Sequence, residues 1–236
     1  MAGRAIYLDL FAGPGICSIR TTNRRVPGSP LIAAHASTPF QKILLCELDD
    51  SNAMACEQRL SQSPARDSFR MFRGDCNEQV SEIIKEIPPG NLTLAFLDPT
   101  GLQAKIDTIR KLSRAGRVDL LILFPDAIDV LRNVETYLPQ LDSKLDQVLG
   151  PDSKWREEWT ALGGADGSRT RKKFADLYRQ QLRKHADYEY FGEEVIKGPK
   201  GPLYRLVFAS KHPRGLEFWD KVTKEELGGQ RRMNFD

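Results

Sequence analysis

Four acidic side chains follow four successive apolar stretches of the chain, each at the point where its stretch ends. They are Asp9, Glu47, Asp75 and Asp98. If the stretches are parallel strands, their carboxyl ends meet at one edge of a sheet, where open α/β sheets bind ligands. Any one of these acids could instead be a solvated loop residue or a helix N-cap. The set of four predicts one acidic cleft that binds a small polar ligand.

The first of these acids opens a glycine-rich turn. Residues 7–15 read Tyr-Leu-Asp-Leu-Phe-Ala-Gly-Pro-Gly, and Gly13 and Gly15 let the backbone turn tightly against a ligand without a Cβ atom in the way. Such a turn serves a dinucleotide, S-adenosylmethionine (SAM), or no ligand at all. Gly15 and Glu47 are 32 positions apart, whereas a dinucleotide fingerprint places its acid roughly 20 residues on. The spacing disfavours a nicotinamide cofactor and an oxidoreductase.

The chemistry of a SAM site offers a role to each acid. Glu47, at the end of the second strand, can accept hydrogen bonds from both ribose hydroxyls, and Asp75 can accept one from the adenine amine. Asp9 could orient the methionine ammonium, directly or through water. Asp98 would face the transferred methyl group, so Asp98 and Pro99 are the expected catalytic residues. The expected cofactor contacts are Asp9, Phe11, Ala12, Gly13, Gly15, Glu47, Leu48, Asp75 and Cys76.

Two basic segments could bind a polyanion. The long segment 16–30 carries Arg20, Arg24 and Arg25, and a basic loop near the cofactor could hold a phosphate backbone. Those arginines could equally pair with surface acids, so both alternatives stay open. The helical segment 169–185 is also strongly basic, but its apolar residues give it a packing face. A solvated helix side is the favoured interpretation there.

Apolar runs and helical patterns alternate through the first half of the chain. Near-continuous apolar runs are typical of strands that are covered on both faces. Alternation of such strands with helices predicts a doubly wound, mostly parallel α/β sheet. The predicted strands are Ala5–Leu10, Lys42–Glu47, Phe69–Arg73, Leu92–Leu97 and Val118–Phe124, and the predicted helices are Pro30–Ser37, Asp50–Gln62, Glu78–Glu86 and Lys105–Arg114.

The second half of the chain has a different pattern. Residues 126–186 predict a helical insertion, and two strand-like runs, Tyr188–Ile196 and Leu203–Ser210, follow it. The six residues between these runs include two glycines and two prolines, which predicts an antiparallel hairpin. Five parallel strands that close with such a hairpin are the Rossmann-like layout of class I SAM-dependent methyltransferases. We expect one such domain over residues 1–236.

Composition narrows the class of protein. The chain has 236 residues, of which 40% are hydrophobic and 28% charged, as expected for a globular protein. No apolar run approaches the roughly 18 residues that span a bilayer, and no signal segment is visible, so we expect a cytoplasmic protein without a membrane partner. The four cysteines and three histidines form no metal-binding spacing. Residues 151–236 hold 18 basic against 14 acidic residues, which permits a nucleic-acid partner.

Four motifs together resemble the three-Cys-motif partner (TcmP) family. They are Asp9-Leu-Phe-Ala-Gly-Pro-Gly15, Gly28-Ser-Pro30-Leu-Ile, Asp98-Pro-Thr-Gly101 and Phe208-Ala-Ser-Lys-His212-Pro-Arg-Gly215. The resemblance extends from Tyr7 to about Trp219. It implies a class I methyltransferase fold, SAM binding, and association with a separate cysteine-motif protein. It does not supply a substrate.

The motif that begins at Asp98 bears on the acceptor. Nucleic-acid enzymes that methylate amines have a similar Asp/Asn-Pro-Pro followed by an aromatic ring, which stacks on a flipped base. Here Gly101 offers no ring, and Phe11, Phe124 or Tyr137 are the candidates to replace it. We therefore predict a SAM-dependent methyltransferase that acts on a nitrogen or oxygen, most simply of a nucleic acid. The alternative is a methyltransferase-like module that binds SAM or a nucleoside and serves as an inactive partner or regulatory subunit.

Overall fold

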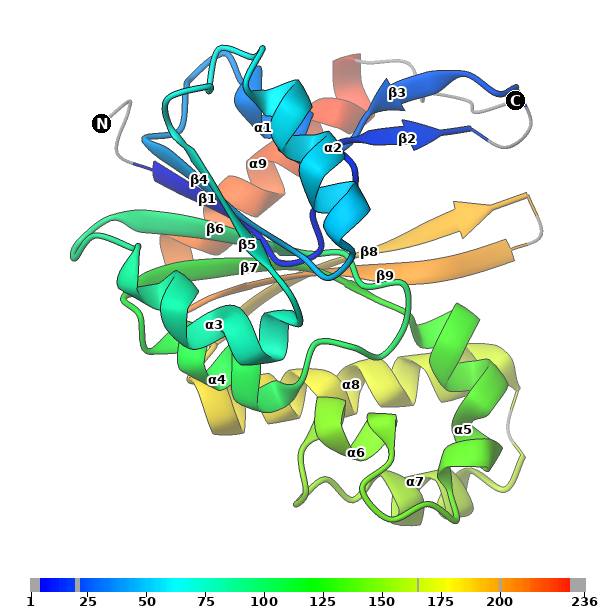
Figure 1. Cartoon of the computed structure of the whole chain (residues 1–236). Helices are drawn as coiled ribbons and strands as arrows, with labels where there is room; N and C mark the ends of the chain where they lie inside the picture. The colour runs from blue at the N-terminus through cyan, green and yellow to red at the C-terminus, as the bar shows by residue number, and fades with distance from the viewer. Residues whose placement is uncertain (1–4, 20–21, 165, 200, 230–236) are drawn as a thin grey trace.

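The computed structural model describes residues 5–19, 22–164, 166–199 and 201–229. Its centre is a mixed sheet whose strand order is β5-β4-β1-β6-β7-β9-β8 (Figure 1). The first five strands in this order are parallel, whereas β9 is antiparallel to β7 and β8 is antiparallel to β9. The strands are β1 (Ala5–Asp9), β4 (Lys42–Glu47), β5 (Phe69–Arg73), β6 (Leu92–Leu97), β7 (Arg117–Phe124), β8 (Tyr190–Gly198) and β9 (Gly201–Ser210).

Helices cover both faces of this sheet, which confirms the predicted fold class. We call the two faces upper and lower, as they lie in Figure 1. The upper face carries α1 (Ser29–Ala34), α2 (Asp50–Leu60) and α9 (Pro213–Gly229), and the lower face carries α3 (Cys76–Lys85), α4 (Ile106–Ser113) and α8 (Gly167–Ala186). Apolar side chains of the strands pack with these helices into two hydrophobic clusters. The sheet thus has the doubly wound arrangement that its apolar runs require.

Helical residues fill the segment between β7 and β8, below the sheet. A short π-helix (Asp126–Val130) leads into α5 (Leu131–Tyr137), α6 (Lys144–Leu149), α7 (Trp155–Leu162) and then α8. Basic side chains of α8 pair with acids of the same region: Lys173 with Glu158, and Lys184 with Asp152. These ion pairs join α8 to neighbouring segments at the protein surface, as expected of a solvated helix side.

The basic segment after the first strand forms its own small sheet. Strands β2 (Ile16–Ser18) and β3 (Arg25–Pro27) pair antiparallel above the main sheet (Figure 1). The base of this hairpin is closed by Gly28, whose N–H donates to the Gly15 carbonyl at 2.8 Å. A Cβ atom on Gly28 would lie 3.1 Å from that carbonyl oxygen, so the close approach favours glycine.

A helix that crosses a bilayer needs roughly 20 predominantly apolar residues. Within the described ranges, no helix is both long and apolar enough to do so.

Candidate functional site

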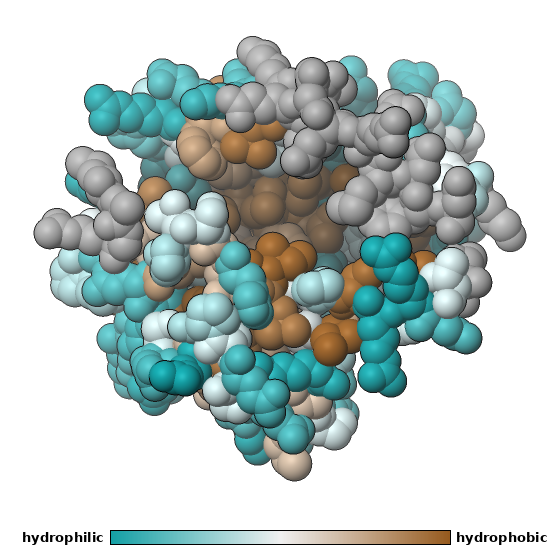
Figure 2. All heavy atoms as spheres, turned by 90° about the horizontal axis from the view of Figure 1, so that it is seen from above, coloured by the Kyte–Doolittle hydropathy of each residue, from teal (hydrophilic) through white to brown (hydrophobic). Residues whose placement is uncertain are grey.

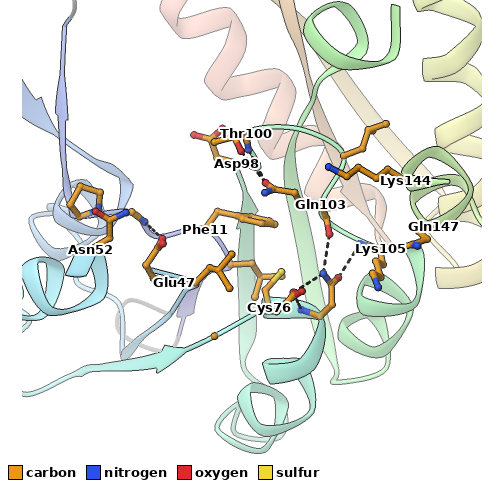
Figure 3. Close-up of a pocket in the computed structure, with 18 residues that line it drawn as sticks. Phe11, Glu47, Asn52, Cys76, Asp98, Thr100, Gln103, Lys105, Lys144 and Gln147 are labelled. Carbon is orange, nitrogen blue, oxygen red and sulfur yellow. Dashed lines mark hydrogen bonds between the residues drawn. The ribbon is translucent and has the colours of Figure 1, made fainter. Parts of the chain in front are cut away.

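A cavity of about 500 Å³ opens at the carboxyl edge of β1, β4, β5 and β6 (Figure 3). The ring of Phe11 projects into its middle, with Glu47 and Asn52 on one side and Lys105, Lys144 and Gln147 on the other. The lining residues are Leu10, Phe11, Gly13, Pro14, Glu47, Leu48, Asn52, Gly74, Asp75, Cys76, Asn77, Asp98, Thr100, Leu102, Gln103, Lys105, Lys144 and Gln147. Three of the four predicted acids therefore meet in one cavity.

Backbone donors fix the carboxylate of Glu47 at the end of β4. The N–H of Gly13 donates to Oε2 at 2.7 Å, and the N–H of Asp49 donates to Oε1 at 3.0 Å. Gly13 has a φ of +60°, a conformation that glycine adopts at little cost. Each carboxylate oxygen keeps a further lone pair. Glu47 is thus oriented for two neighbouring hydroxyl donors of a ligand.

Asp75 is the N-cap of α3 and also faces the cavity. Its Oδ1 accepts from the backbone N–H of Asn77 at 2.8 Å and from Asn77 Nδ2 at 2.7 Å. Asn77 in turn contacts the loop before α4, since Nδ2 donates to the Gln103 carbonyl and Oδ1 accepts from the Lys105 N–H. Asn77 therefore fixes both Asp75 and the far wall of the cavity.

Asp9, one of the predicted cofactor contacts, is buried behind the cavity. Its side chain is 0% exposed. It accepts hydrogen bonds from Tyr7 Oη at 3.2 Å, the Phe11 N–H at 3.0 Å and Ser29 Oγ at 2.6 Å. Burial raises the pKa of Asp9 to about 6, although these hydrogen bonds oppose the shift. Asp9 does not line the cavity; it holds the glycine turn and the start of α1 from behind.

The other predicted cofactor contacts divide into lining and supporting residues. Phe11, Gly13, Leu48 and Cys76 line the cavity. Ala12 is buried, and its N–H donates to the Cys46 carbonyl at 3.0 Å. Gly15 packs against Cys56, whose Sγ would lie 3.3 Å from an added Cβ atom. Ala12 and Gly15 therefore shape the turn without reaching the cavity surface.

Asp98 follows β6 and lies at the cavity rim. Its side chain faces the open cleft, but the surrounding protein desolvates it and raises its pKa above the ordinary aspartate value. In Figure 3 it lies on the opposite side of Phe11 from Cys76. Pro99, the second expected catalytic residue, is buried and does not line the cavity. Asp98 is thus the carboxylate placed to meet a second ligand.

The structure explains why glycine follows Thr100. A Cβ atom on Gly101 would lie 2.7 Å from Oδ2 of Asp129. That same oxygen accepts from the Leu102 N–H at 3.0 Å, and Oδ1 accepts from Tyr137 Oη at 2.6 Å. Asp129 therefore ties the loop after β6 to the π-helix and α5, and the close approach leaves no room for an aromatic side chain at Gly101.

The aromatic residues named as substitutes for a ring at this loop do not face the same place. Phe124 is the last residue of β7, and its side chain is buried on the lower face of the sheet. There it stacks on Tyr178 of α8 with ring centroids 4.5 Å apart. Tyr137 is buried and bonded to Asp129. Phe11 lines the cavity itself. Of these three aromatic residues, Phe11 is the one that faces the cavity.

The predicted substrate-binding arginines lie apart from the cavity. Arg24 and Arg25 are exposed on the β2–β3 hairpin and are not among the lining residues. Arg20 lies outside the described residues. The basic hairpin therefore sits on the upper side of the molecule, and a role for it in substrate binding stays a prediction.

Sequence reasoning missed the contribution of the insertion to the cavity. Lys144 and Gln147 of α6 close the side opposite Glu47 (Figure 3). Asn52, Gln103 and Lys105 also line the cavity, and each lies shortly after a strand end. Position after a strand end could have indicated these three, whereas nothing local marks α6 as a cavity wall.

Solved structures that resemble this fold include two O-methyltransferases. TomG, an O-methyltransferase from Streptomyces achromogenes involved in tomaymycin synthesis and solved with SAM, is 12% identical with a TM-score of 0.51, over 89% of this chain and 74% of TomG. An O-methyltransferase from Bacillus cereus, solved with S-adenosylhomocysteine (SAH), is 12% identical with a TM-score of 0.50, over 88% and 74%. No protein-family model and no curated protein matches the sequence. The resemblance to the TcmP family stays a prediction, and the chain has the fold of class I SAM-dependent methyltransferases.

Proposed function

We propose that this protein is a SAM-dependent methyltransferase. The observation that carries the proposal is the Glu47 carboxylate, which two backbone N–H groups orient at the edge of the cavity. The two hydroxyls of a ribose match such a carboxylate, because each can donate one hydrogen bond to it. Two proteins of the same fold were solved with SAM or SAH, which supports the same cofactor here.

The described residues fit the nucleoside part of SAM. The cavity volume of about 500 Å³ lies within the range of roughly 300 to 1,000 Å³ that is usual for such ligands. Glu47 would hold the ribose, Asp75 the adenine amine, and Phe11 and Leu48 the apolar faces of the nucleoside. When bound, SAM supplies an electrophilic methyl group on a sulfonium.

The chain's own contribution to the chemistry centres on Asp98. Its raised pKa makes it a stronger base than an ordinary aspartate, so it can take a proton from an acceptor N–H or O–H. Positioning by the cavity walls supplies the rest, because two reactants held in line react as one molecule. Asp129 assists indirectly, since it fixes the loop that carries Asp98.

We further infer that the acceptor is a nitrogen or oxygen of a nucleic acid. The Asp98-Pro99 pair and the exposed Arg24 and Arg25 support this inference. The alternative is a methyltransferase-like module that binds SAM or a nucleoside and serves as a partner or regulatory subunit without catalytic activity. The position of Asp98 supports the enzyme, because a carboxylate at the cavity rim can meet an acceptor beside the cofactor.

Calorimetry with SAM, SAH and NAD tests the cofactor. We expect SAM and SAH to bind and NAD not to bind, and we expect Glu47→Ala to weaken SAM binding more than tenfold. Glu82→Ala, which removes an exposed acid of α3 far from the cavity, is the matched control and should bind as the wild type does. Absence of SAM binding, or equal binding by Glu47→Ala, would exclude this assignment.

Radiolabelled SAM with mixed RNA and DNA tests the reaction. We expect label transfer, and we expect Asp98→Ala to reduce its rate by about 10²- to 10⁴-fold, as for loss of a general base. Label transfer at an unchanged rate would remove Asp98 from the mechanism. SAM binding without transfer to any polymer would favour the partner module.

A further inference from the structure

A row of half-buried apolar side chains crosses the upper face of the sheet beside Asp98. Leu123 of β7 pairs with Leu206 of β9. The β6–β7 register pairs Leu97 with Ile122, so the next residue, Asp98, lies level with Leu123. Residues level with one another on neighbouring strands project to the same face. We call this row the upper strip: Phe96, Leu121, Leu123, Tyr204 and Leu206.

Among the described residues, the upper strip is less covered than the lower face of the same strands. All five of its residues are only half-buried, whereas Leu120, Ile122 and Val207 on the lower face are buried in the main core. Helix α9 covers the far end of the upper face, where Trp219 stacks on Phe208 with ring centroids 5.5 Å apart. From above, the molecule shows a hollow with an apolar floor (Figure 2). A half-open apolar floor that adjoins a reactive carboxylate is typical of a ligand surface.

Tyr204 supplies the aromatic ring that the loop at Gly101 lacks. It lies two residues from Leu206 along β9, on the same face and beyond the last residue of β7. Burial and the negative charge of Asp98 raise the pKa of Tyr204, so the two side chains lie within electrostatic range. At neutral pH its phenol is therefore un-ionised, and its ring is available for stacking.

We propose that the upper strip binds the acceptor as a planar aromatic or heteroaromatic ring, with Tyr204 stacked on the ring and Asp98 at its N–H or O–H. This inference rests on the proposed function and names its acceptor class. The proposal rests on the continuity between the cofactor cavity and the upper strip, because Asp98 lines the cavity and also lies level with the strip. The flat apolar floor suits a ring better than a branched or charged acceptor. A free aromatic compound and a flipped nucleobase share this chemistry.

The reaction balances with the groups that are present. The acceptor's lone pair forms the new bond to the methyl carbon. The electron pair of the broken carbon–sulfur bond stays on sulfur, so that the sulfonium leaves as a neutral thioether. The acceptor's proton passes to the Asp98 carboxylate and then to solvent. No further reactant is required.

Titration of the SAH-saturated protein tests the proposal without turnover. The probes are naphthol, a free planar ring with a hydroxyl, and a short single-stranded DNA of mixed sequence. We expect Tyr204→Leu to weaken the binding of at least one probe by about fivefold or more, because stacking on an aromatic side chain contributes on the order of 1 kcal/mol or more. Tyr204→Phe keeps the ring and should bind as the wild type does. Phe218→Ala, which removes an exposed ring of α9, is the matched control.

Each outcome decides one point. Loss of naphthol binding indicates a free aromatic acceptor, and loss of DNA binding alone indicates a nucleobase in a polymer. Wild-type affinity in Tyr204→Leu for both probes, or no binding of either probe to the wild type, overturns the proposal. Thermal unfolding establishes that Tyr204→Leu is folded. Failure of SAH itself to bind counts against the proposed function, and the titrations repeated without SAH then still test the strip.

Discussion

The two faces of the sheet at β7 and β9 both carry apolar side chains, but neighbouring elements bury them to different degrees. On the lower face, which α4 and α8 cover, Leu120 and Val207 are 0% exposed. On the upper face, Leu123 and Leu206 of the same strands are half-buried. Near-continuous apolar strands normally have both faces covered. Among the described residues, this row is therefore the less tightly covered of the two apolar faces at these strands.

A leucine-to-alanine substitution on each face should give the largest difference between the two faces, measured as the free energy of unfolding. Leu120→Ala leaves a cavity in the closed core, and we expect a loss of about 2 to 5 kcal/mol in the free energy of unfolding. Leu123→Ala removes a side chain that is already half in solvent, so we expect about 1 kcal/mol, as judged from its smaller buried area. Urea denaturation measures both.

The two leucines also predict opposite effects on binding. Leu123→Ala should weaken naphthol binding to the SAH-saturated protein, whereas Leu120→Ala should leave it unchanged as long as the protein is folded. Equal losses of stability at the two positions would mean that the upper face is closed in solution, and the comparison would then fail.

Asp9 is a fully buried acid on the upper side of the sheet, beside Tyr7, and its titration can be tested. Its folded-state pKa of about 6 lies above the ordinary aspartate value. Between these two values the folded state holds more protons than the unfolded state, so stability falls as pH rises through this window and levels off above it. Asp9→Asn lacks this titration, and the wild type should lose about 2 to 3 kcal/mol relative to it between pH 4 and 7.

Urea denaturation of both proteins at several pH values checks this sign. Asp67→Asn, which alters a highly exposed acid, is the control and should follow the wild type. A stability difference between wild type and Asp9→Asn that does not change with pH would show that Asp9 is not desolvated in the folded state. Water would then reach the Asp9 side chain more readily than the structure indicates.

Strand positions could be predicted from sequence because their signal is local. Lys42–Glu47, Phe69–Arg73 and Leu92–Leu97 begin and end as expected. The β2–β3 hairpin and α9 were not predicted. Strands of three residues carry too little pattern to be recognised. The apolar side of α9 packs back on the preceding strand, where Trp219 stacks on Phe208.

The site could be predicted only as far as the strand ends. Position after a strand placed Glu47, Asp75 and Asp98 correctly at one edge. It failed for Asp9, because depth depends on the neighbours of a side chain, here Tyr7 and Ser29. The cavity wall from α6 and the ring of Tyr204 depend on how distant segments pack, which no local spacing records.

Gly101 links the two faces, since its loop carries Asp98 above and is held by Asp129 below. In Gly101→Ala the new Cβ atom displaces the Asp129 carboxylate, and we expect a loss of about 1 to 2 kcal/mol from the broken hydrogen bond to Leu102. In an Asp129→Ala background the same change should cost less, because the clash is gone. A double-mutant cycle in urea measures this coupling, and simple additivity would contradict the link.

Charge offers the mildest test of the difference between the faces. Arg24 and Arg25 are exposed on the upper hairpin, whereas Lys173 below the sheet is paired with Glu158. If the acceptor is a base in a polymer that lies on the upper strip, each hairpin arginine that contacts a phosphate should contribute about one unit to the slope of log affinity against log salt. Arg24→Ala and Arg25→Ala should each lower that slope, measured with single-stranded DNA, while Lys173→Ala should not. An equal effect of Lys173→Ala would mean that DNA binds by net charge alone and does not select the upper face.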